Sequence, residues 1–485
     1  MMSEHDHGKK FEHNFMTRRE LLGVMGNGFA MAGLTGLMGA EGMLGSPAYA
    51  ATGSSTSNPM APRHAPLPAK AKRVIFLFMN GGPSQVDTFD PKPMLAKYNG
   101  QPAPAGNLKT ERKTGNLLQS PFAFKKFGKS GIEVSEIFSK LGSHIDDCCV
   151  IRSMYTERPN HEPSLLLMNS GDKLSGRPSM GSWLTYGLGT ENRNLPGFVV
   201  LCPGYPVLGP QLWSSTFLPA VYQGTYIPNN EKTPDKLVQY VRNPELQLPA
   251  QRQQLDLLAK LNKAHIARVG EDSELEASIQ TAEIAFRMQS EAPDVFDISK
   301  ESEATRNRYG TSDFGRACLM SLRLVEKGVR MVQVYHGNGQ PWDSHDDIQD
   351  HKRLAKEADA GIAALLEDLK LRGLFNDTLV IVGGEFGRTP AVEVSGLVKV
   401  QNGRDHNSHG FSMVLAGGGV KGGYVHGATD DFGFKAVDKP VHIHDLHATV
   451  LHLMGMDHTK LTYRYSGRDF RLTDVAGNVV NEIIA

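Results

Sequence analysis

The chain has 485 residues, of which 40% are hydrophobic and 21% charged, proportions typical of a folded globular protein rather than a disordered one. Its 52 basic residues balance its 52 acidic residues, so overall charge gives no reason to expect binding to nucleic acid or to an anionic membrane. Four cysteines without a CxxC spacing exclude a cysteine-rich zinc module, and we expect buried thiols rather than a disulfide framework.

The first fifty residues have the pattern of an export signal. Arg18 and Arg19 precede an apolar stretch rich in Gly and Ala, and Ala48-Tyr49-Ala50 has the small residues of a cleavage site. The arginine pair favours the twin-arginine route, which exports folded proteins. The stretch is short and interrupted by glycines, which favours a leader that is cleaved or loosely tethered. We therefore expect a protein of the periplasm or cell envelope, with no stable membrane span in the mature chain.

Six short apolar runs follow a linker. Residues 51–71 are rich in Ser, Pro and Ala, a composition that predicts disorder. Continuous apolar runs bounded by turn residues are typical of buried parallel strands. They cover residues 73–79, 148–154, 197–201, 330–335, 378–382 and 411–415.

Helical patterns alternate with these strands. Residues 351–372 carry one apolar stripe and end before Gly373, a typical C-terminal cap. Residues 251–289 predict one or two helices, and residues 445–454 a short final one. The alternation predicts an α/β fold, a three-layer sandwich with a mostly parallel central sheet. Residues 203–300 have little strand character and are interpreted as an insertion that caps the sheet edge.

Acidic, histidine and arginine residues recur between Trp342 and Gly423. This stretch contains WDSH (342–345), GGEFGRTP (383–390) and GRDHNSHGF (403–411), on loops that follow predicted strands. Asp, Glu and His are metal ligands, and arginines suit anionic substrates. Loops at strand ends are where α/β folds place their chemistry. The stretch therefore predicts a metal-dependent enzyme.

Further motifs carry a family resemblance. They are FLFMNGGPSQVDTFDPKP (76–93), RPNHEPSLLLMNSG (158–171), RPSMGSWLTYGLG (177–189), LAGGGVKGG (415–423), DLHATVLHLMG (445–455) and YSGRDFRLTD (465–474). With the motifs above, the chain resembles the family called domain of unknown function 1501. This family consists of exported bacterial proteins assigned to the alkaline-phosphatase-like superfamily, which also holds sulfatases and phosphodiesterases. The resemblance implies an alkaline-phosphatase-like domain over residues 72–485.

The resemblance implies a divalent metal ion, with Zn, Mn or Ca as candidates. The superfamily's Asp and His after a central strand match Asp343 and His345. Asp347 and His351 have the wider spacing found in phosphatases, but they enter the predicted helix, so the WDSH pair is preferred.

The remaining ligands implied by the resemblance are less complete. Glu385 stands where a second metal's Asp is expected, and Phe386 replaces that metal's His. Asn80 takes the place of the Asp that usually ends the first strand, and either Asn80 or Asp87 could supply an oxygen ligand from that region. The candidates for the distant donors are Asp405, His406 and His409.

The reacting groups are also implied by the resemblance. Residues 161–171 are similar to the sulfatase frame C-x-P-S-R-x-x-L-L-T-G, with His161 in the nucleophile's place, so a conventional sulfatase mechanism is not expected. His161 is a candidate metal ligand, acceptor of the transferred group or general acid–base, with a helix cap as its alternative role. Thr156 is a second candidate nucleophile. Arg388 and Arg404 are candidates for holding the ester's oxygens.

These features predict an exported, metal-dependent hydrolase of phosphate or sulfate esters, with a small-molecule or glycan ester as its partner and no nucleic acid. Substrate choice would lie in residues 203–300, where Trp213, Tyr222 and Tyr226 could stack on a sugar or aryl group or could simply pack. The departures from the superfamily motifs leave an alternative, a non-catalytic, metal-stabilised binding or scaffold protein on the same fold.

Overall fold

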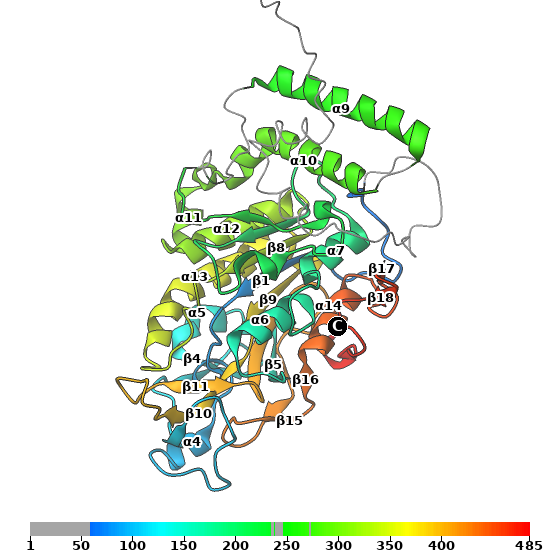
Figure 1. Cartoon of the computed structure of the whole chain (residues 1–485). Helices are drawn as coiled ribbons and strands as arrows, with labels where there is room; N and C mark the ends of the chain where they lie inside the picture. The colour runs from blue at the N-terminus through cyan, green and yellow to red at the C-terminus, as the bar shows by residue number, and fades with distance from the viewer. Residues whose placement is uncertain (1–58, 234–236, 238–245, 271–272) are drawn as a thin grey trace, which may run out of the picture.

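A computed structural model describes residues 59–485, apart from 234–236, 238–245 and 271–272 (Figure 1). The predicted signal peptide and residues 51–58 of the predicted linker lie outside the described residues. Residues 59–71 lie against the domain, because the N–H of Arg63 donates to the carbonyl of Leu188 at 2.9 Å and that of Lys70 to Leu453 at 2.8 Å. The predicted disorder therefore does not extend over residues 59–71.

Nine of the described strands form one mixed central sheet. They are β1 (Arg73–Phe78), β5 (Cys148–Tyr155), β6 (Phe198–Leu201), β7 (Thr225–Ile227), β8 (Met331–Tyr335), β9 (Thr378–Gly383), β12 (Phe411–Ala416), β13 (Tyr424–His426) and β16 (Val441–His442). The strand order is β13-β5-β12-β9-β1-β8-β6-β7, with β16 beside β5. β12 runs antiparallel to its neighbours β9 and β5, and the other pairings are parallel.

All six predicted strands are present, with small changes at their ends. Strand β1 shows why these runs are continuously apolar. Ile75 and Leu77 belong to one hydrophobic core and Phe76 and Phe78 to the other, so successive side chains are buried on opposite faces. The predicted α/β sandwich with a mostly parallel sheet is therefore confirmed.

Helices cover both faces of the sheet (Figure 1). One core includes side chains of α5 (Ser139–Gly142), α12 (Asp313–Glu326) and α13 (Asp350–Leu371), with α11 (Glu303–Tyr309) beside α13. The other core includes side chains of α6 (His161–Ser170), α7 (Met180–Leu188) and α14 (Ile443–Leu453). The helices predicted over 351–372 and 445–454 are α13 and α14, and Gly373 has the positive φ of 69° that follows a helix end.

The predicted insertion contains the edge strand β7 and two long helices. The stretch predicted as one or two helices is two, α9 (Leu248–Val269) and α10 (Ser273–Phe296), which contact each other at the top of Figure 1. Trp213 and Tyr222 are buried, and the rings of Trp213 and Tyr226 are stacked with centroids 5.8 Å apart. These aromatic residues therefore pack within the protein, which was one of the two roles predicted for them.

A small antiparallel sheet joins the two strands that follow β9 in the chain to an earlier one. It consists of β2 (Thr114–Leu117), β10 (Gly387–Glu393) and β11 (Arg404–Asn407), in the order β11-β10-β2. The pairing places Arg388 opposite His406, so it brings the GGEFGRTP and GRDH motifs side by side. Two short helices, α3 (Gln85–Thr88) and α4 (Pro93–Lys97), precede β2. The remaining hairpins are β3 (Phe124–Phe127) with β4 (Ile132–Ser135), β14 (Ala428–Thr429) with β15 (Ala436–Asp438), and β17 (Tyr463–Tyr465) with β18 (Arg468–Phe470).

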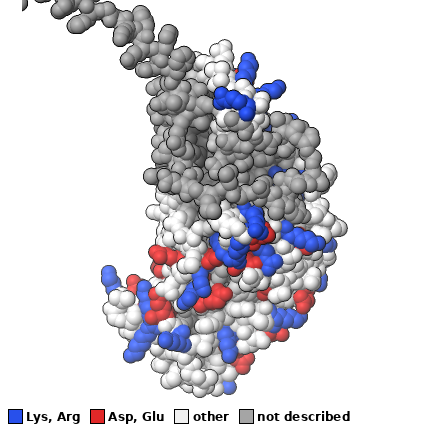
Figure 2. Space-filling model, turned by 45° about the vertical axis from the view of Figure 1, so that its right-hand side comes forward, with Lys and Arg blue, Asp and Glu red and all other residues white. Residues whose placement is uncertain are grey.

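Three further properties bear on the sequence predictions. All four cysteines are buried free thiols, as predicted. Over most of the described residues seen in Figure 2, basic and acidic side chains are interspersed. Within the described part of the chain, no helix combines the length and the apolar run needed to cross a bilayer.

Candidate metal centre

Neighbouring loops meet where the central strands end. β8, β1 and β9 are adjacent and parallel, so the loops that follow them lie together at the carboxyl edge of the sheet. The loop after β8 carries Asp343 and His345, and the loop after β9 carries Glu385. Gly81, on the loop after β1, has φ of +111°, and a Cβ atom there would lie 2.7 Å from the backbone nitrogen of Asp343. Glycine at this position therefore allows the two loops to touch.

Four side chains converge at this edge. His161, Asp343, His345 and His406 each offer one ligand atom, and these atoms all lie within 4.8 Å of one another. The Nε2 atoms of His161, His345 and His406 lie 3.2, 2.8 and 3.1 Å from Asp343 Oδ1. The Asp343 side chain is 22% exposed, whereas that of His406 is 5% exposed. The cluster is therefore largely enclosed and reaches solvent mainly through Asp343.

Each histidine is held from behind by a glutamate. A carboxylate can only accept, so each Nδ1 is the protonated nitrogen in these pairs, and a neutral ring then turns the Nε2 lone pair toward the centre. The pairs are His161 Nδ1 with Glu385 Oε1 at 2.7 Å, His406 Nδ1 with Glu111 Oε2 at 3.0 Å, and His345 Nδ1 with Glu393 Oε2.

This geometry fits a metal cation. The Nε2 atoms of His345 and His406 are 3.0 Å apart, and two neutral lone pairs at that distance repel unless a cation lies between them. The buried Nε2 of His161 lies 3.2 Å from Asp343 Oδ1 but is not oriented for a hydrogen bond to it or to any other described atom. Buried polar atoms normally have partners, so an orphaned nitrogen beside a carboxylate indicates that a further group belongs here. Nitrogen and carboxylate donors with glutamates behind them are the pattern of metal-binding histidines.

The charges separate the histidines into two kinds. Burial raises the pKa of Asp343, but the nearby Arg388 guanidinium and the three imidazoles outweigh it and hold that pKa well below its usual range. Burial lowers the pKa of His161, but the adjacent carboxylates of Asp343 and Glu385 outweigh this and raise it above its usual value. Burial, aided by the charges of Arg388 and His161, lowers the pKa of His406 to about 3. His406 is therefore a neutral imidazole, while the carboxylates beside His161 favour its protonated form.

The two arginines predicted to hold the ester are enclosed by protein. The side chains of Arg388 and Arg404 are both 0% exposed. Arg388 donates to backbone carbonyls and to Asp343 Oδ1 at 2.5 Å. Arg404 donates to both oxygens of Asp87, at 2.7 and 3.2 Å, and to backbone carbonyls. This placement differs from the prediction, because the donors of both arginines and the carboxylate of Asp87 are used to hold loops together.

Other predicted ligands lie around the cluster. Glu385 is adjacent, because it binds His161 and accepts the N–H of Gly81 at 3.0 Å. Asp405 accepts the backbone N–H groups of Arg112 and His406 at 2.7 and 2.8 Å, and together with His345 and Glu393 it forms a second group of possible ligands that overlaps the first. Glu393 Oε2 already accepts from His345, so the first group is the better metal site.

The alternatives considered for the metal do not join the cluster. His409 is exposed and belongs to neither group of possible ligands found among the described residues. His351 is fully buried, accepts the N–H of Ser84 at 3.0 Å, and has a pKa lowered by burial to about 3. Phe386 contributes no donor and instead packs against the rings of His161 and His406, with centroids 4.8 Å away in both cases.

Sequence reasoning missed two residues of this site, Glu111 and Glu393. Glu393 ends β10, and Glu111 lies on the loop before β2; neither belongs to a motif quoted above. The general rule that a ligand histidine has a carboxylate partner predicts that such residues exist. It does not predict which of the 52 acidic residues they are.

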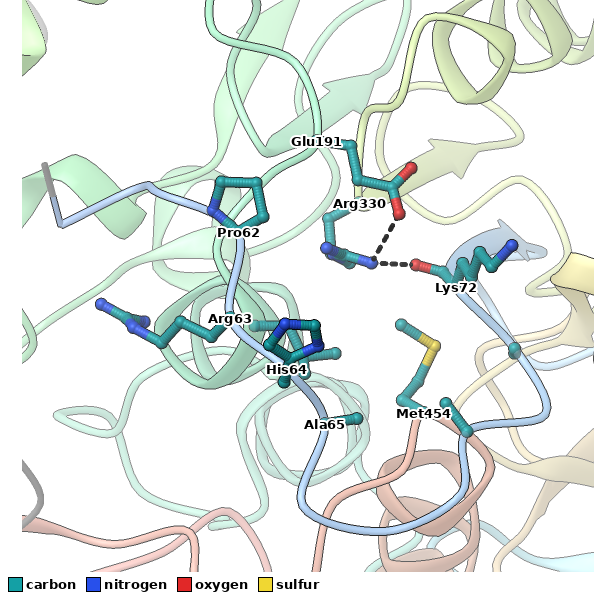
Figure 3. Close-up of a pocket in the computed structure, with 11 residues that line it drawn as sticks. Pro62, Arg63, His64, Ala65, Lys72, Glu191, Arg330 and Met454 are labelled. Atoms are coloured by element: carbon teal, nitrogen blue, oxygen red, sulfur yellow. Dashed lines mark hydrogen bonds and ion pairs between the residues drawn. The ribbon is translucent and has the colours of Figure 1, made fainter.

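A cavity of about 270 Å³ lies away from this cluster (Figure 3). Its lining includes His64, Lys72 and Arg330, and the last two directly precede β1 and β8, so the cavity is at the amino edge of the sheet. The Arg330 guanidinium donates to the carbonyls of Gly189 and Lys72 at 3.1 and 2.5 Å and lies 3.8 Å from Glu191. Its donors thus hold the segment 62–72 against the domain, and none of the predicted site residues lines this cavity.

A family model described as "Protein of unknown function (DUF1501)" matches residues 71–484. The chain belongs to this family. The match confirms the resemblance stated from the motifs. Comparison with curated protein sequences finds no significant match.

Several solved structures are similar over most of the chain. The PsFucS1 sulfatase from Pseudoalteromonas sp. is 13% identical, with a TM-score of 0.33 over 80% of this chain and 68% of that one. The lipoteichoic acid synthase LtaP from Listeria monocytogenes is 9% identical, with a TM-score of 0.34 over 83% and 75%. A protein in the alkaline phosphatase superfamily from Vibrio parahaemolyticus is 10% identical, with a TM-score of 0.34 over 82% and 70%. At these scores the matches carry no argument about the reaction.

Proposed function

We propose that this protein is a metal-dependent hydrolase of phosphate or sulfate esters. The observation that carries the proposal is the convergence of three imidazole Nε2 atoms on Asp343, each imidazole being held from behind by a glutamate. A structural metal site is usually closed by four protein ligands, whereas a catalytic site leaves one position open. Partial exposure at Asp343 is consistent with the second kind.

In this proposal Asp343, His345 and His406 hold the cation. His406 is suited to this role because its lowered pKa keeps it neutral and its Nε2 free to coordinate. Three donors of this mixed nitrogen and oxygen type favour Zn²⁺ or Mn²⁺ over Ca²⁺, which prefers six to eight oxygens. A divalent cation held here would polarise the ester and generate a nucleophile from water at neutral pH.

His161 is the proton donor in the same proposal. The neighbouring carboxylates of Asp343 and Glu385 raise its pKa and so favour the protonated ring, and Glu385 Oε1 stabilises the imidazolium by accepting from Nδ1 at 2.7 Å. As the ester bond breaks, the Nε2 proton passes to the leaving oxygen, so the departing group leaves as a neutral alcohol. The glutamate holds the ring orientation, as the aspartate does in a Ser-His-Asp triad. Two histidines with oppositely shifted pKa values thus take different roles.

An anionic ester suits the backbone around His161. His161 is the first residue of the ten-residue helix α6, and the side chain of its N-cap Asn160 makes no capping hydrogen bond. The first N–H groups of a helix and its dipole favour an anion, which here would be the phosphoryl or sulfuryl group of a small-molecule or glycan ester. The enclosed arginines are left out of this role.

The test compares three variants of the purified mature protein. We expect aryl phosphate or aryl sulfate hydrolysis in Zn²⁺ or Mn²⁺, and loss of both metal binding and turnover in His345→Ala. His161→Gln should keep the metal but lose about 10²- to 10⁴-fold in turnover, the usual contribution of a general acid. The matched control, exposed His409→Ala, should leave both unchanged. Metal binding by the wild type with no turnover of either the aryl phosphate or the aryl sulfate would instead support the non-catalytic scaffold.

Export to the periplasm or cell envelope by the twin-arginine route remains part of the proposal. It rests on the arginine pair and the apolar stretch within residues 1–50. Cell fractionation should recover the chain outside the cytoplasm, and replacement of Arg18 and Arg19 by lysines should retain it inside. Equal export of the two forms would contradict this route.

A further inference from the structure

One of the three glutamates behind the histidines differs from the other two. The side chains of Glu385 and Glu393 are 0% exposed, and these residues lie directly after β9 and at the end of β10. The Glu111 side chain is 35% exposed and lies on the irregular segment between α4 and β2. One of the histidines that face Asp343 therefore depends on a surface loop for its orientation. We call residues 107–113 the support loop.

The support loop also contacts the surroundings of the other two histidines. Asn160, directly before His161, donates to Glu111 Oε1 at 2.8 Å. The Arg112 guanidinium donates at 3.2 Å to Glu393 Oε1, on the carboxylate that holds His345. Two adjacent residues of one loop thus contact His406 itself, the glutamate that holds His345, and the residue before His161.

Backbone hydrogen bonds of Arg112 and Lys113 also anchor the support loop. The backbone N–H of Arg112 donates to Asp405 Oδ2 at 2.7 Å, next to His406 in the chain. The carbonyl of Lys113 accepts from the N–H of Val394 at 2.9 Å, directly after Glu393. These backbone contacts fix the position from which the Glu111 side chain reaches His406.

We infer that Glu111 is a positioning residue that sets the metal affinity of the centre through His406. This inference rests on the proposed function, because it takes the cluster to be a metal site. Accepting from Nδ1 fixes the His406 ring with Nε2 toward Asp343 and strengthens that nitrogen as a ligand. Replacing Glu111 leaves His406 Nδ1 without this partner, but the Glu111 side chain is 35% exposed, so its loss opens no cavity in the core. The melting temperature of the metal-free protein then reports any effect on folding separately from the effect on the metal.

The experiment measures Zn²⁺ affinity by competition with a chromophoric chelator, and the visible spectrum of the Co²⁺-loaded protein, for wild type and variants. Glu111→Ala should weaken Zn²⁺ binding about 10- to 100-fold, the usual effect of losing such a partner, and should change the Co²⁺ spectrum. Glu111→Gln should weaken it less, because its amide oxygen still accepts from Nδ1. Exposed Glu136→Gln, a control for loss of one acidic charge, should stay within twofold of wild type.

Two results would overturn this inference without affecting the proposed function. One is a Zn²⁺ affinity of Glu111→Ala within twofold of wild type. The other is a loss of Zn²⁺ affinity in the Glu136→Gln control equal to that in Glu111→Ala. A lower melting temperature of metal-free Glu111→Ala with unchanged metal affinity would likewise assign the residue a purely structural role. Failure of the wild type itself to bind Zn²⁺, Mn²⁺ or Co²⁺ would overturn the proposed function and this inference together.

Discussion

Replacement of Asp343 by Asn should change the stability of the protein in two distinct ways. In the metal-free protein, Asp343 Oδ1 is the anionic partner of the fully buried Arg388, at 2.5 Å, and the remaining hydrogen bonds of that guanidinium are to uncharged backbone carbonyls. Breaking a buried ion pair costs about 3–5 kcal/mol, and we expect the lower end because the Asp343 side chain is 22% exposed. The first effect is therefore a loss of about 3 kcal/mol without any metal.

The second effect of Asp343→Asn is loss of the stabilisation that metal provides. Metal at 100 times its dissociation constant stabilises the wild type by about 2.7 kcal/mol, or about 5 °C in melting temperature at roughly 2 °C per kcal/mol for a large domain. The variant should show no such rise, because it lacks the anionic ligand.

Thermal unfolding of both proteins, with and without Zn²⁺ or Mn²⁺, measures the two effects. Asp347→Asn is the matched control, since Asp347 lies four residues away, belongs to the alternative phosphatase-like spacing, and is bonded to Asn402 and to the N–H of Gln349 rather than to the cluster. The reasoning is refuted if Asp343→Asn keeps the full metal-dependent rise, or if Asp347→Asn loses it.

Three further outcomes are expected. A chelator should lower the melting temperature of the wild type but leave that of His345→Ala unchanged, and an equal drop in both would place the metal elsewhere. Arg404→Met should lower the free energy of unfolding in urea by about 3–5 kcal/mol, because it leaves buried Asp87 without its cation. The Zn²⁺ affinity of this variant should stay within twofold of wild type. Unchanged stability together with weaker ester binding would instead support the predicted role of Arg404 on the substrate. His447 is fully buried and burial lowers its pKa to about 3, so below pH 6.5 the unfolded chain takes up a proton that the folded one refuses. Stability contributed by the neutral ring is thus complete above pH 6.5 and falls by about 2 kcal/mol at pH 5. The drop between pH 7 and pH 5 in denaturant unfolding should shrink in His447→Gln, and an unchanged drop would assign it to other groups.

Several features of the site could be predicted from the sequence because they depend on short-range patterns. WDSH lies on the loop that follows the buried strand β8, so the chain itself places Asp343 and His345 at the carboxyl edge of the sheet. His406 was one of three candidates, and the pairing of β10 with β11 selects it over exposed His409.

The roles of the arginines and the glutamates could not be predicted in this way. An arginine on a loop beside metal ligands has the same sequence signature whether its guanidinium faces the substrate or the protein interior. Arg404 binds Asp87 across 317 positions of the chain, and His406 meets Glu111 across 295. No local pattern records which of many carboxylates ends up within hydrogen-bonding distance.

The sequence by itself therefore determined the strands, the principal helices, the family and two members of the cluster, Asp343 and His345, because burial on both faces of a strand and the spacing of a motif are local properties. Only the tertiary structure decided that His161 lies beside Asp343, that the two buried arginines bind neighbouring loops rather than the substrate, and that three glutamates bind the Nδ1 atoms of the three histidines. These decisions depend on hydrogen bonds, whose strength falls away within an ångström or so of ideal geometry, and that geometry is set by the packing of the whole domain.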